Sequence, residues 1–431
     1  MLSINLLREQ KDWVIERLEI KHVREARIWV EEILSLDLKR RQVLTSLEES
    51  RAESNRLAKS IGQFMAQGDT QSAESAKTGA NQLRDDVKNL EEQLKAIELE
   101  QQAILVKLPN LPHSSVPVGK TPEENSITYQ HQVILSLPAD AKPHWELAKS
   151  LDIIDFELGN KITGAGFPVY KGQGARLQRA LINFFLEEAN RAGYLEIQPP
   201  IMINAESGFG TGQLPDKEGQ MYFVNEDNLY LIPTAEVPIT NLYRDVIVSE
   251  KELPIKNCGY TPCFRREAGS YGKDVRGLNR LHQFDKVEIV QITHPDESYK
   301  TLEEMSEYVQ SLLKKLELPY RVALLCGGDI SFNSAKTYDM EVWSGGQQKW
   351  LEVSSVSNFE SFQANRLKLR YKSAQGNVLC HTLNGSALAL PRIVAAMLEN
   401  GQTADGEVML PPVLHSYFGA DRLTQVSERK N

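Results

Sequence analysis

The stretch CFRREAGSYGKDVRGLNRLHQFDKVEIV, residues 263–290, carries the strongest structural signal in the chain. It reads as a strand, a loop rich in glycine and charge, and a second strand. Because side chains alternate along a strand, Phe284, Lys286 and Glu288 are predicted to share one face of the second strand. With Arg265 at the end of the first strand, this wall offers cations, an aromatic ring and carboxylates. Such a mixture suits a polyphosphate, a flat base and an ammonium group.

The overall composition indicates a folded protein of several domains. With 431 residues, 41% of them hydrophobic and 25% charged, the chain can form two or three domains with large cores. The formal net charge of −9 argues against a surface coated in basic residues. A local basic track is still compatible with RNA, which responds to charges within roughly 10 Å at ~0.1 M salt. The four cysteines show no CxxC spacing, so we expect reduced, unpaired thiols.

The beginning of the chain bears on localisation. The stretch MLSINLLREQKDWVIERLEIKH contains four acidic residues, which is untypical of a signal or transit peptide. No apolar run approaches the roughly 20 residues of a membrane span. We therefore expect a cytoplasmic protein with no membrane partner.

Two stretches near the N-terminus carry a heptad pattern. Over 26–65 the chain has almost no glycine or proline, and apolar residues recur every three or four positions. Residues 66–70 predict a turn, and a second stripe runs over 83–108. Two long helices joined by a short turn must run antiparallel. At 1.5 Å per residue, each helix would reach about 60 Å.

Two interpretations of this helical arm are open on the residues alone. Periodicity favours a dimerisation or spacer coiled coil. A track of basic residues on the first helix would instead suit RNA phosphates, but glutamates are interleaved with it, so charge does not decide. The basic residues are Lys39, Arg40, Arg41, Arg51, Arg56 and Lys59.

A proline-rich linker follows the arm. Residues 109–117, PNLPHSSVP, contain three prolines that prevent the helix from continuing. We expect an N-terminal domain at 1–115, with the arm at about 26–108, and a second domain at 116–431.

Three separate motifs resemble those of one enzyme family. Residues 264–284 resemble motif 2 of class II aminoacyl-tRNA synthetases, in the wording typical of seryl-tRNA synthetases. The helix-to-strand turn GYLEIQPP at 193–200 resembles motif 1, and HTLNGSALALPR at 381–392 resembles motif 3. The resemblance implies an α+β fold, with the coiled-coil arm preceding a catalytic domain built on an antiparallel β-sheet flanked by helices. It also implies a homodimer through motif 1 and an arm that clasps the long variable arm of tRNA.

The resemblance implies a serine site. Thr234-Ala235-Glu236 matches the family's serine-binding triplet, and a hydroxyl and a carboxylate on one face could hold an α-amino group, because an ammonium needs acceptors. Together with later positions in motifs 2 and 3, the implied L-serine contacts are Thr234, Ala235, Glu236, Glu288, Asn384 and Ser386.

The resemblance also implies an ATP site. Arg265 would bridge the serine carboxylate and the α-phosphate with its planar fork. Glu267, expected on the same strand face, would accept from the adenine amino group, Phe284 would stack on the base, and Arg280 would meet the distal phosphates. The implied ATP contacts are Arg265, Arg266, Glu267, Arg280, Leu281, Phe284, Glu352, Val353, Ser354, Ser355 and Arg392, of which Arg265 and Arg392 are the implied catalytic residues.

The strand KWLEVSS at 349–355 matches the family's ATP- and magnesium-binding element. Glu352 and Ser355 are the implied Mg²⁺ ligands, since Mg²⁺ prefers oxygen. Strict alternation would place these two residues on opposite faces, so we expect the strand to end or bulge between them. Arg392 lies at the start of a predicted helix, where a guanidinium and the helix N-terminus together favour an anion. The histidines show no HxxxH or HExxH spacing, and no zinc is expected.

The implied activity is that of a serine–tRNA ligase. It would form seryl adenylate from L-serine and ATP and transfer the seryl group to the 3′ end of tRNA(Ser), and of tRNA(Sec) where that tRNA exists. Two alternatives are a ligase that charges a carrier protein, against which the arm argues, and a non-catalytic RNA-binding paralogue. Such paralogues usually lose a motif arginine or the magnesium glutamate, but Arg265, Glu352 and Arg392 are all present.

Overall fold

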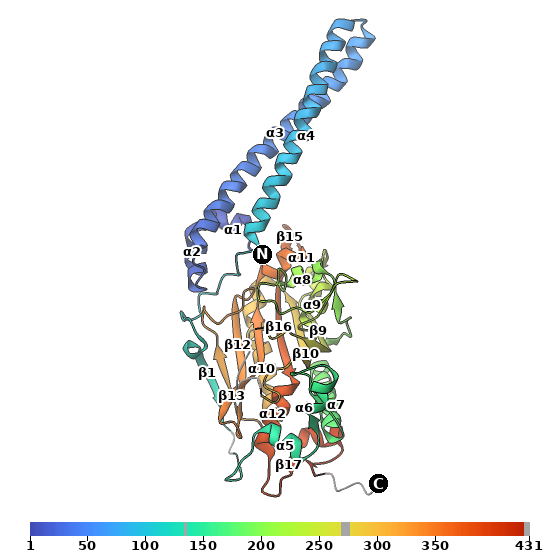
Figure 1. Ribbon diagram of the computed structural model, residues 1–431. Helices are drawn as coiled ribbons and strands as arrows, with labels where there is room; N and C mark the ends of the chain where they lie inside the picture. The colour runs from blue at the N-terminus through green and yellow to red at the C-terminus, as the bar shows by residue number, and fades with distance from the viewer. Residues whose placement is uncertain (133–134, 136, 269–275, 426–431) are drawn as a thin grey trace. The chain divides into compact units, whose positions relative to one another are not determined.

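The computed structural model describes residues 1–132, 135, 137–268 and 276–425 (Figure 1). The chain divides into two compact units, Met1–Pro109 and Asn110–Asn431. The first is helical and the second combines helices with a mostly antiparallel sheet, which confirms the α+β prediction. Most of the glycine-rich loop predicted within motif 2 lies outside the described residues.

The N-terminal unit contains the predicted antiparallel helix pair. Two short helices precede it, and the prediction of two long helices joined at 66–70 is confirmed. The helices are α1 (Ile4–Glu9), α2 (Lys11–Ile20), α3 (Ala26–Ala66) and α4 (Thr70–Leu105). The Asp69 side chain accepts a hydrogen bond from the Ser72 amide, so it caps the start of α4.

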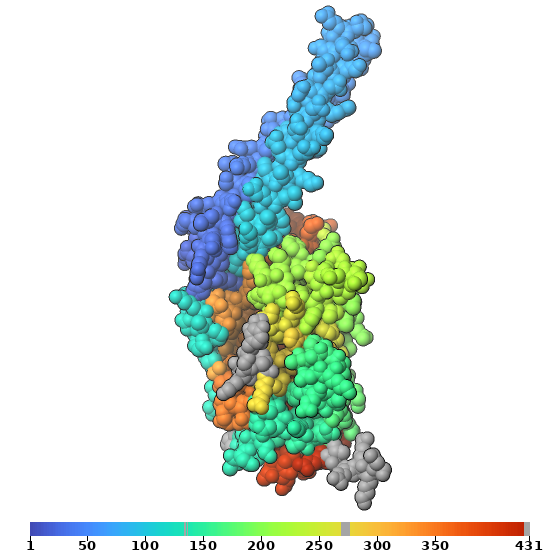
Figure 2. Space-filling view, viewed as in Figure 1, coloured from blue at the N-terminus to red at the C-terminus, as the bar shows by residue number. Residues whose placement is uncertain are grey.

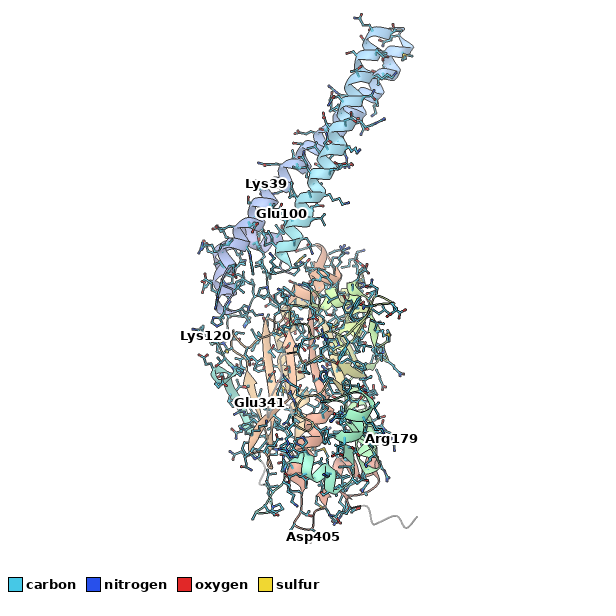
Figure 3. All side chains as sticks on the ribbon, in the orientation of Figure 1. Lys39, Glu100, Lys120, Arg179, Glu341 and Asp405 are labelled. Atoms are coloured by element: carbon cyan, nitrogen blue, oxygen red, sulfur yellow. The ribbon has the colours of Figure 1, made fainter. Side chains whose placement is uncertain are left out.

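Polar contacts fasten the two long helices to one another along their length. Gln101 of α4 donates to the Ile33 carbonyl of α3 at 3.2 Å. Farther along, Arg51 forms a 2.6 Å ion pair with Glu91. Figure 2 shows the atoms of the two helices packed side by side, and Figure 3 shows side chains projecting outward from them, among them the exposed Lys39 and Glu100.

The second unit is built on an eight-stranded sheet in the order β1-β11-β12-β13-β16-β10-β9-β4. Neighbouring strands are antiparallel, except that β4 runs parallel to β9. The strands are β1 (Ser126–His131), β4 (Leu195–Glu196), β9 (Ile255–Phe264), β10 (Gln283–Thr293), β11 (Tyr320–Leu324), β12 (Lys336–Ser344), β13 (Lys349–Asn358) and β16 (His381–Ala389).

The main hydrophobic core lies between the sheet and its longer helices. Apolar faces of α7 (Gln173–Arg191), α10 (Ser298–Lys315) and α12 (Leu390–Gly401) enter this core. Val287 and Ile289 of β10 also belong to this core. Lys286 and Glu288 alternate with them along the strand, so their side chains point to the opposite face of the sheet. The sheet therefore presents a polar face for a site.

Shorter elements connect these layers. Within the described ranges, every helix is too short or too polar to traverse a bilayer. The shorter elements are η1 (Pro122–Glu124), α5 (His144–Ser150), β2 (Ile154–Asp155), α6 (Phe156–Ile162), β3 (Val169–Tyr170), β5 (Met202–Ile203), α8 (Ala205–Thr211), β6 (Phe223–Val224), β7 (Leu229–Leu231), α9 (Glu236–Asn241), β8 (Ile247–Ser249), η2 (Glu250–Glu252), η4 (Pro295–Glu297), α11 (Ser361–Leu367), β14 (Arg370–Ser373), β15 (Gly376–Leu379), β17 (Val408–Met409), η5 (Pro412–Leu414), α13 (His415–Phe418) and β18 (Arg422–Leu423).

Candidate active site

The two strands of motif 2 are neighbours in the sheet. β9 and β10 pair antiparallel, with Phe284 opposite Cys263. The first strand ends at Phe264, and Glu267 adopts a positive φ of 49°. The expectation that Arg265 and Glu267 share a face by strand alternation is therefore wrong, because the chain leaves the extended conformation between them.

Contacts across the two strands nevertheless gather the residues expected to bind ATP. The Arg265 guanidinium carbon lies 5.3 Å from the centre of the Phe284 ring. Glu267 and Arg280 form a 3.1 Å ion pair. The backbone amide of Arg266 donates to the Gln220 carbonyl at 2.9 Å, which fixes the chain just after β9. Cation, ring and carboxylate therefore lie together at one end of β9 and β10.

The residues expected to bind serine form a second, more buried group. The Thr234 hydroxyl donates to a Glu288 carboxylate oxygen at 3.1 Å, and the Glu236 amide donates to that hydroxyl at 3.2 Å. All three side chains are buried, with Ala235 beside them. Burial, with the neighbouring Glu288 carboxylate, raises the pKa of Glu236 to about 7.

The triplet lies in a turn that follows strand β7. β7 ends at Leu231, and Glu236 opens helix α9. A turn, rather than strand alternation, thus brings Thr234 and Glu236 together. The hydroxyl of Thr234 satisfies the Glu236 amide, which would otherwise lack a partner at the start of the helix.

Two polar residues of this group were not assigned a role from the sequence. Lys286 forms an ion pair with Glu288 and is itself buried. Gln363 of α11 donates to Glu236 at 2.6 Å and accepts from the Thr382 hydroxyl at 2.7 Å. Period-two alternation places Lys286 on the correct face, but no local pattern connects Gln363 with Glu236.

Motif 3 completes the serine group on β16. Ser386 lies opposite Glu288 in the β10–β16 register, and Asn384 forms a side-chain hydrogen bond with Glu236. Both side chains are buried. Glu288 therefore lies between the Thr234 turn on one side and the Ser386 backbone on the other.

Arg392 joins motif 3 to the other two elements. It lies in the first turn of α12, its Nε donates to the Asn279 carbonyl at 3.0 Å, and one terminal nitrogen donates to the Glu352 carbonyl at 2.6 Å. The same guanidinium lies 3.6 Å from the Glu352 carboxylate. Because Asn279 immediately precedes Arg280, the two arginines belong to one connected set of contacts.

The expected irregularity in β13 is present. The β12–β13 register shifts between Met340 and Glu341, so that Val353 is skipped between Glu352 and Ser354. This bulge confirms the prediction and lets the Ser355 hydroxyl lie 3.4 Å from the Glu352 carboxylate. Asp339, opposite Ser355, is half-buried beside Glu352, and desolvation of its carboxyl together with that carboxylate raises its pKa well above the usual value.

This end of β13 fits a hard cation. Glu352 and Ser355 supply two neighbouring oxygens of the kind that Mg²⁺ prefers, and the Asp339 carboxyl lies beside them.

Three expected ATP contacts have buried side chains. Leu281 and Val353 belong to the main hydrophobic core, and the Ser354 hydroxyl donates to the Ser386 carbonyl at 2.6 Å. Only their backbone groups could reach a nucleotide.

Comparisons with protein families agree with the two units. Residues 1–112 match the family model of the seryl-tRNA synthetase N-terminal domain. Residues 222–401 match the model of the class II tRNA synthetase core domain shared by the G, H, P, S and T enzymes.

Individual proteins match over nearly the whole chain. A serine–tRNA ligase from Salinibacter ruber is 47% identical over 425 residues, which cover 98% of this chain and 99% of the relative. The crystal structure of seryl-tRNA synthetase from Pyrococcus horikoshii complexed with ATP has a TM-score of 0.91 and 33% identity, covering 99% of this chain and 100% of that one. The structure of the cytoplasmic serine–tRNA ligase from Naegleria fowleri in complex with AMP has a TM-score of 0.86 and 26% identity, covering 99% of both chains. With its motifs, its fold and these full-length relatives in agreement, the chain belongs to the seryl-tRNA synthetase family of class II aminoacyl-tRNA synthetases.

Proposed function

We propose that this chain is a serine–tRNA ligase whose active site is the polar face of β9, β10, β13 and β16. The reaction joins the carboxylate of L-serine to the α-phosphorus of ATP and expels pyrophosphate. The seryl group then passes from the adenylate to the 3′ end of tRNA. The observation that carries this proposal is that one strand, β10, holds both Glu288, which accepts from Thr234, and Phe284, which lies under Arg265, while Arg392 donates to the Asn279 carbonyl shortly before that strand.

Serine recognition follows from the buried acceptors. The ammonium group of serine offers three donors, and Glu288, Glu236 and the Thr234 hydroxyl supply oxygens close to one another. Asn384 and Ser386 lie on the neighbouring strand and are suited to the side-chain hydroxyl of serine. Lys286 limits the negative charge of this group to a level that one ammonium can balance.

ATP activation requires alignment of two anions rather than proton transfer. The fork of Arg265 can bind one oxygen of the serine carboxylate and one of the α-phosphate, which places the reacting atoms together. Arg280 and Arg392 meet the distal phosphates and stabilise the leaving pyrophosphate. Phe284 stacks on adenine and Glu267 accepts from its amino group. When bound, Mg²⁺ held by Glu352 and Ser355 would neutralise phosphate charge.

The proposed partners are tRNA(Ser) and, where it exists, tRNA(Sec), both through the arm. A homodimer through the motif 1 segment and a cytoplasmic location complete the proposal. The support for the arm's role is the family to which residues 1–112 belong and the exposed Lys39, Lys59 and Arg41 on α3.

Serine-dependent ATP–pyrophosphate exchange tests the activity, and charging of a tRNA with a long variable arm tests the acceptor. Exchange followed by charging is the expected result. Absence of exchange would rule out both enzyme hypotheses, and exchange without charging would favour a ligase that acts on a carrier protein.

The KM for serine is expected to rise as pH falls. The raised pKa of Glu236, about 7, means that this carboxyl is largely ionised at pH 8 and largely protonated at pH 6. Its attraction for the ammonium is present above that pKa and lost below it, so KM should increase by up to about tenfold over this interval. Exchange rates at several serine concentrations, measured at each pH, give the profile.

Glu236→Gln is the matched control, because the glutamine side chain has nearly the same size and shape but cannot ionise. Its KM for serine should be high at every pH and nearly flat. An unchanged slope in this variant would assign the pH dependence to another group.

A mixed dimer tests the proposed assembly. The first chain lacks residues 45–94, a cut that leaves the Ile33–Gln101 contact at the base of the helix pair. The second chain carries Arg265→Ala. If the arm of one subunit serves tRNA at the partner's active site, mixing should restore charging that neither homodimer supports. Continued inactivity of a verified heterodimer would contradict this arrangement.

A further inference from the structure

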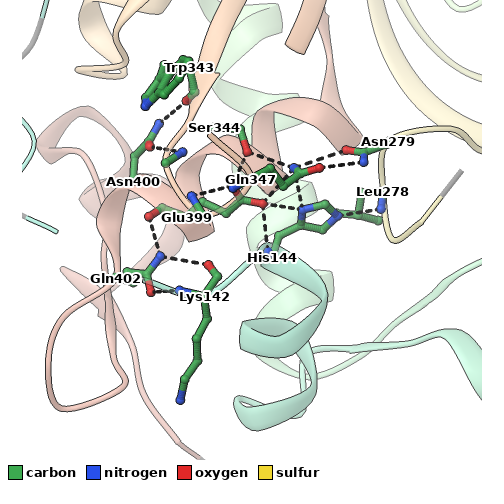
Figure 4. A network of polar contacts seen from close by, with 12 residues as sticks. Lys142, His144, Leu278, Asn279, Trp343, Ser344, Gln347, Glu399, Asn400 and Gln402 are labelled. Carbon is green, nitrogen blue, oxygen red and sulfur yellow. Dashed lines mark hydrogen bonds and ion pairs between the residues drawn. The ribbon is translucent and has the colours of Figure 1, made fainter. Parts of the chain in front are cut away.

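A fully buried acid–imidazole pair lies beside the candidate active site (Figure 4). The side chains of Glu399, on α12, and His144, which opens α5, have no exposed surface. The His144 Nδ1 lies 2.7 Å from Glu399 Oε1, and the His144 backbone amide donates to the same oxygen at 2.9 Å. Neither residue belongs to the motifs identified from the sequence.

Glu399 is held as a carboxylate by its donors. Its second oxygen accepts from the amides of Gly346 and Gln347 at 3.0 and 3.1 Å and from the Ser344 hydroxyl. Although burial acts in the opposite direction, the hydrogen bonds from His144 and Ser344 hold the pKa of Glu399 below its usual value. A buried carboxylate requires a donor from the imidazole, so Nδ1 of His144 carries the hydrogen.

The opposite nitrogen of His144 faces the end of the motif 2 loop. The Leu278 amide donates to His144 Nε2 at 2.8 Å, so this nitrogen is an acceptor and the ring is neutral. Leu278 is followed by Asn279, whose carbonyl accepts from Arg392, and by Arg280. A chain of hydrogen bonds thus runs from Glu399 through His144 to the backbone that places both phosphate-binding arginines.

A second route leads to the same backbone. The side-chain amide of Gln347 donates to Glu399 Oε1 at 2.9 Å, and the side-chain amide of Asn279 donates to Gln347 Oε1 at 2.8 Å. Figure 4 shows both routes, one from Glu399 through His144 to Leu278 and the other from Glu399 through Gln347 to Asn279. Asn279 is therefore fixed both through its neighbour Leu278 and through its own side chain.

The start of α5 is also shaped to receive this segment. Gly277 has a φ of +66°, and a Cβ at this position would lie 2.2 Å from His144 Nε2. The Arg276 guanidinium lies 5.1 Å from the Trp145 ring, which packs edge-on against His144 at 4.9 Å. Only a residue without a side chain allows the backbone to approach the imidazole this closely.

We propose that His144 and Glu399 are positioning residues for ATP, which fix the backbone of Leu278 and Asn279 so that Arg280 and Arg392 are aimed at the distal phosphates. The inference rests on the proposed function, because it assigns these arginines to ATP. Neither His144 nor Glu399 touches substrate. They act through the backbone, and a displacement of about 1 Å at such a site can reduce a rate 10²-fold.

Two amide substitutions separate positioning from simple stability. In His144→Gln, the side-chain oxygen can take the place of Nε2 and accept from Leu278, but the donor to Glu399 is lost. In His144→Asn, the amide nitrogen can replace Nδ1 and donate to Glu399, but the acceptor for Leu278 is lost. Both variants are neutral and both remove one buried hydrogen bond, so each is the other's control.

The measurements are the KM for ATP, the KM for serine and the melting temperature of the full chain. Both variants should melt at lower temperature than the unaltered chain. The KM for ATP in pyrophosphate exchange should rise about tenfold in His144→Asn and stay within about twofold in His144→Gln, with the KM for serine unchanged in both. If the KM for ATP changes equally in the two variants, or in neither, His144 has only a structural role and the proposal is contradicted.

A third variant perturbs the same backbone without removing a polar group. Gly277→Ala leaves every polar group of the network in place and pushes the backbone away from His144. It should raise the KM for ATP without changing that for serine, and an unchanged KM for ATP would contradict the proposal. Failure of the proposed function is distinguishable, since the unaltered chain would then show no serine-dependent exchange.

Discussion

Replacing Arg265 with alanine is expected to lower serine-dependent ATP–pyrophosphate exchange by roughly 10³-fold or more, the effect of removing an arginine that stabilises a transferring phosphoryl group. The guanidinium lies over Phe284, the ring assigned to adenine. In the proposed mechanism it aligns two anions that otherwise repel one another, so most of the loss should appear in kcat. Steady-state exchange kinetics at saturating serine and ATP measure this effect.

Two variants make the Arg265 result specific. Arg265→Lys keeps the charge but loses the planar fork, so it should recover only a small part of the activity. Arg179→Ala removes an exposed arginine of α7, which Figure 3 places at the surface, and should leave exchange unchanged. Full activity in Arg265→Lys would show that charge alone suffices and would contradict the proposed bidentate contact.

Removing the outer part of the helical arm should abolish charging and spare activation. In the chain lacking residues 45–94, the residues of the proposed active site are intact, so exchange should stay within about twofold of normal. The kcat/KM for tRNA should fall by roughly 10²-fold or more, because the arm's contacts with phosphates are lost. Charging assays with tRNA(Ser) compare the two activities in one preparation.

The controls for the arm use its charges rather than its length. Lys39→Glu with Lys59→Glu keeps the helix and reverses two exposed cations, so it should weaken charging and reduce its dependence on salt. Exchanging Arg51 and Glu91 preserves their ion pair and the net charge, and should have a smaller effect. Normal charging by the shortened chain would return the arm to a spacer or dimerisation role.

Periodic patterns predicted the elements that depend on near neighbours. The heptad stripes anticipated α3 and α4 because the helical period alone determines which side chains lie on one side. The bulge between Glu352 and Ser355 was predicted because strict alternation would place these two residues on opposite faces of the strand, although both are implied Mg²⁺ ligands. Motif 2 was recognised as two strands, although the exact end of β9 was not.

Contacts between distant segments were beyond these patterns. Gln363 reaches Glu236, and Glu399 reaches His144, across separations that no local period describes. Thr234 and Glu236 meet in a turn at the start of α9, where the Glu236 amide donates to the Thr234 hydroxyl. Burial likewise set the raised pKa of Glu236, since it depends on what surrounds the carboxyl in space.

The amino-acid order therefore determined the helices, the strand pair and the chemical types of the site residues, all of which arise from neighbours within a few positions. The tertiary structure decided which of those residues meet, which carboxyls keep their protons near neutral pH, and how the segment before Arg280 is held. The physical reason for this division is that desolvation and hydrogen-bond geometry depend on segments that come together only when the sheet has formed.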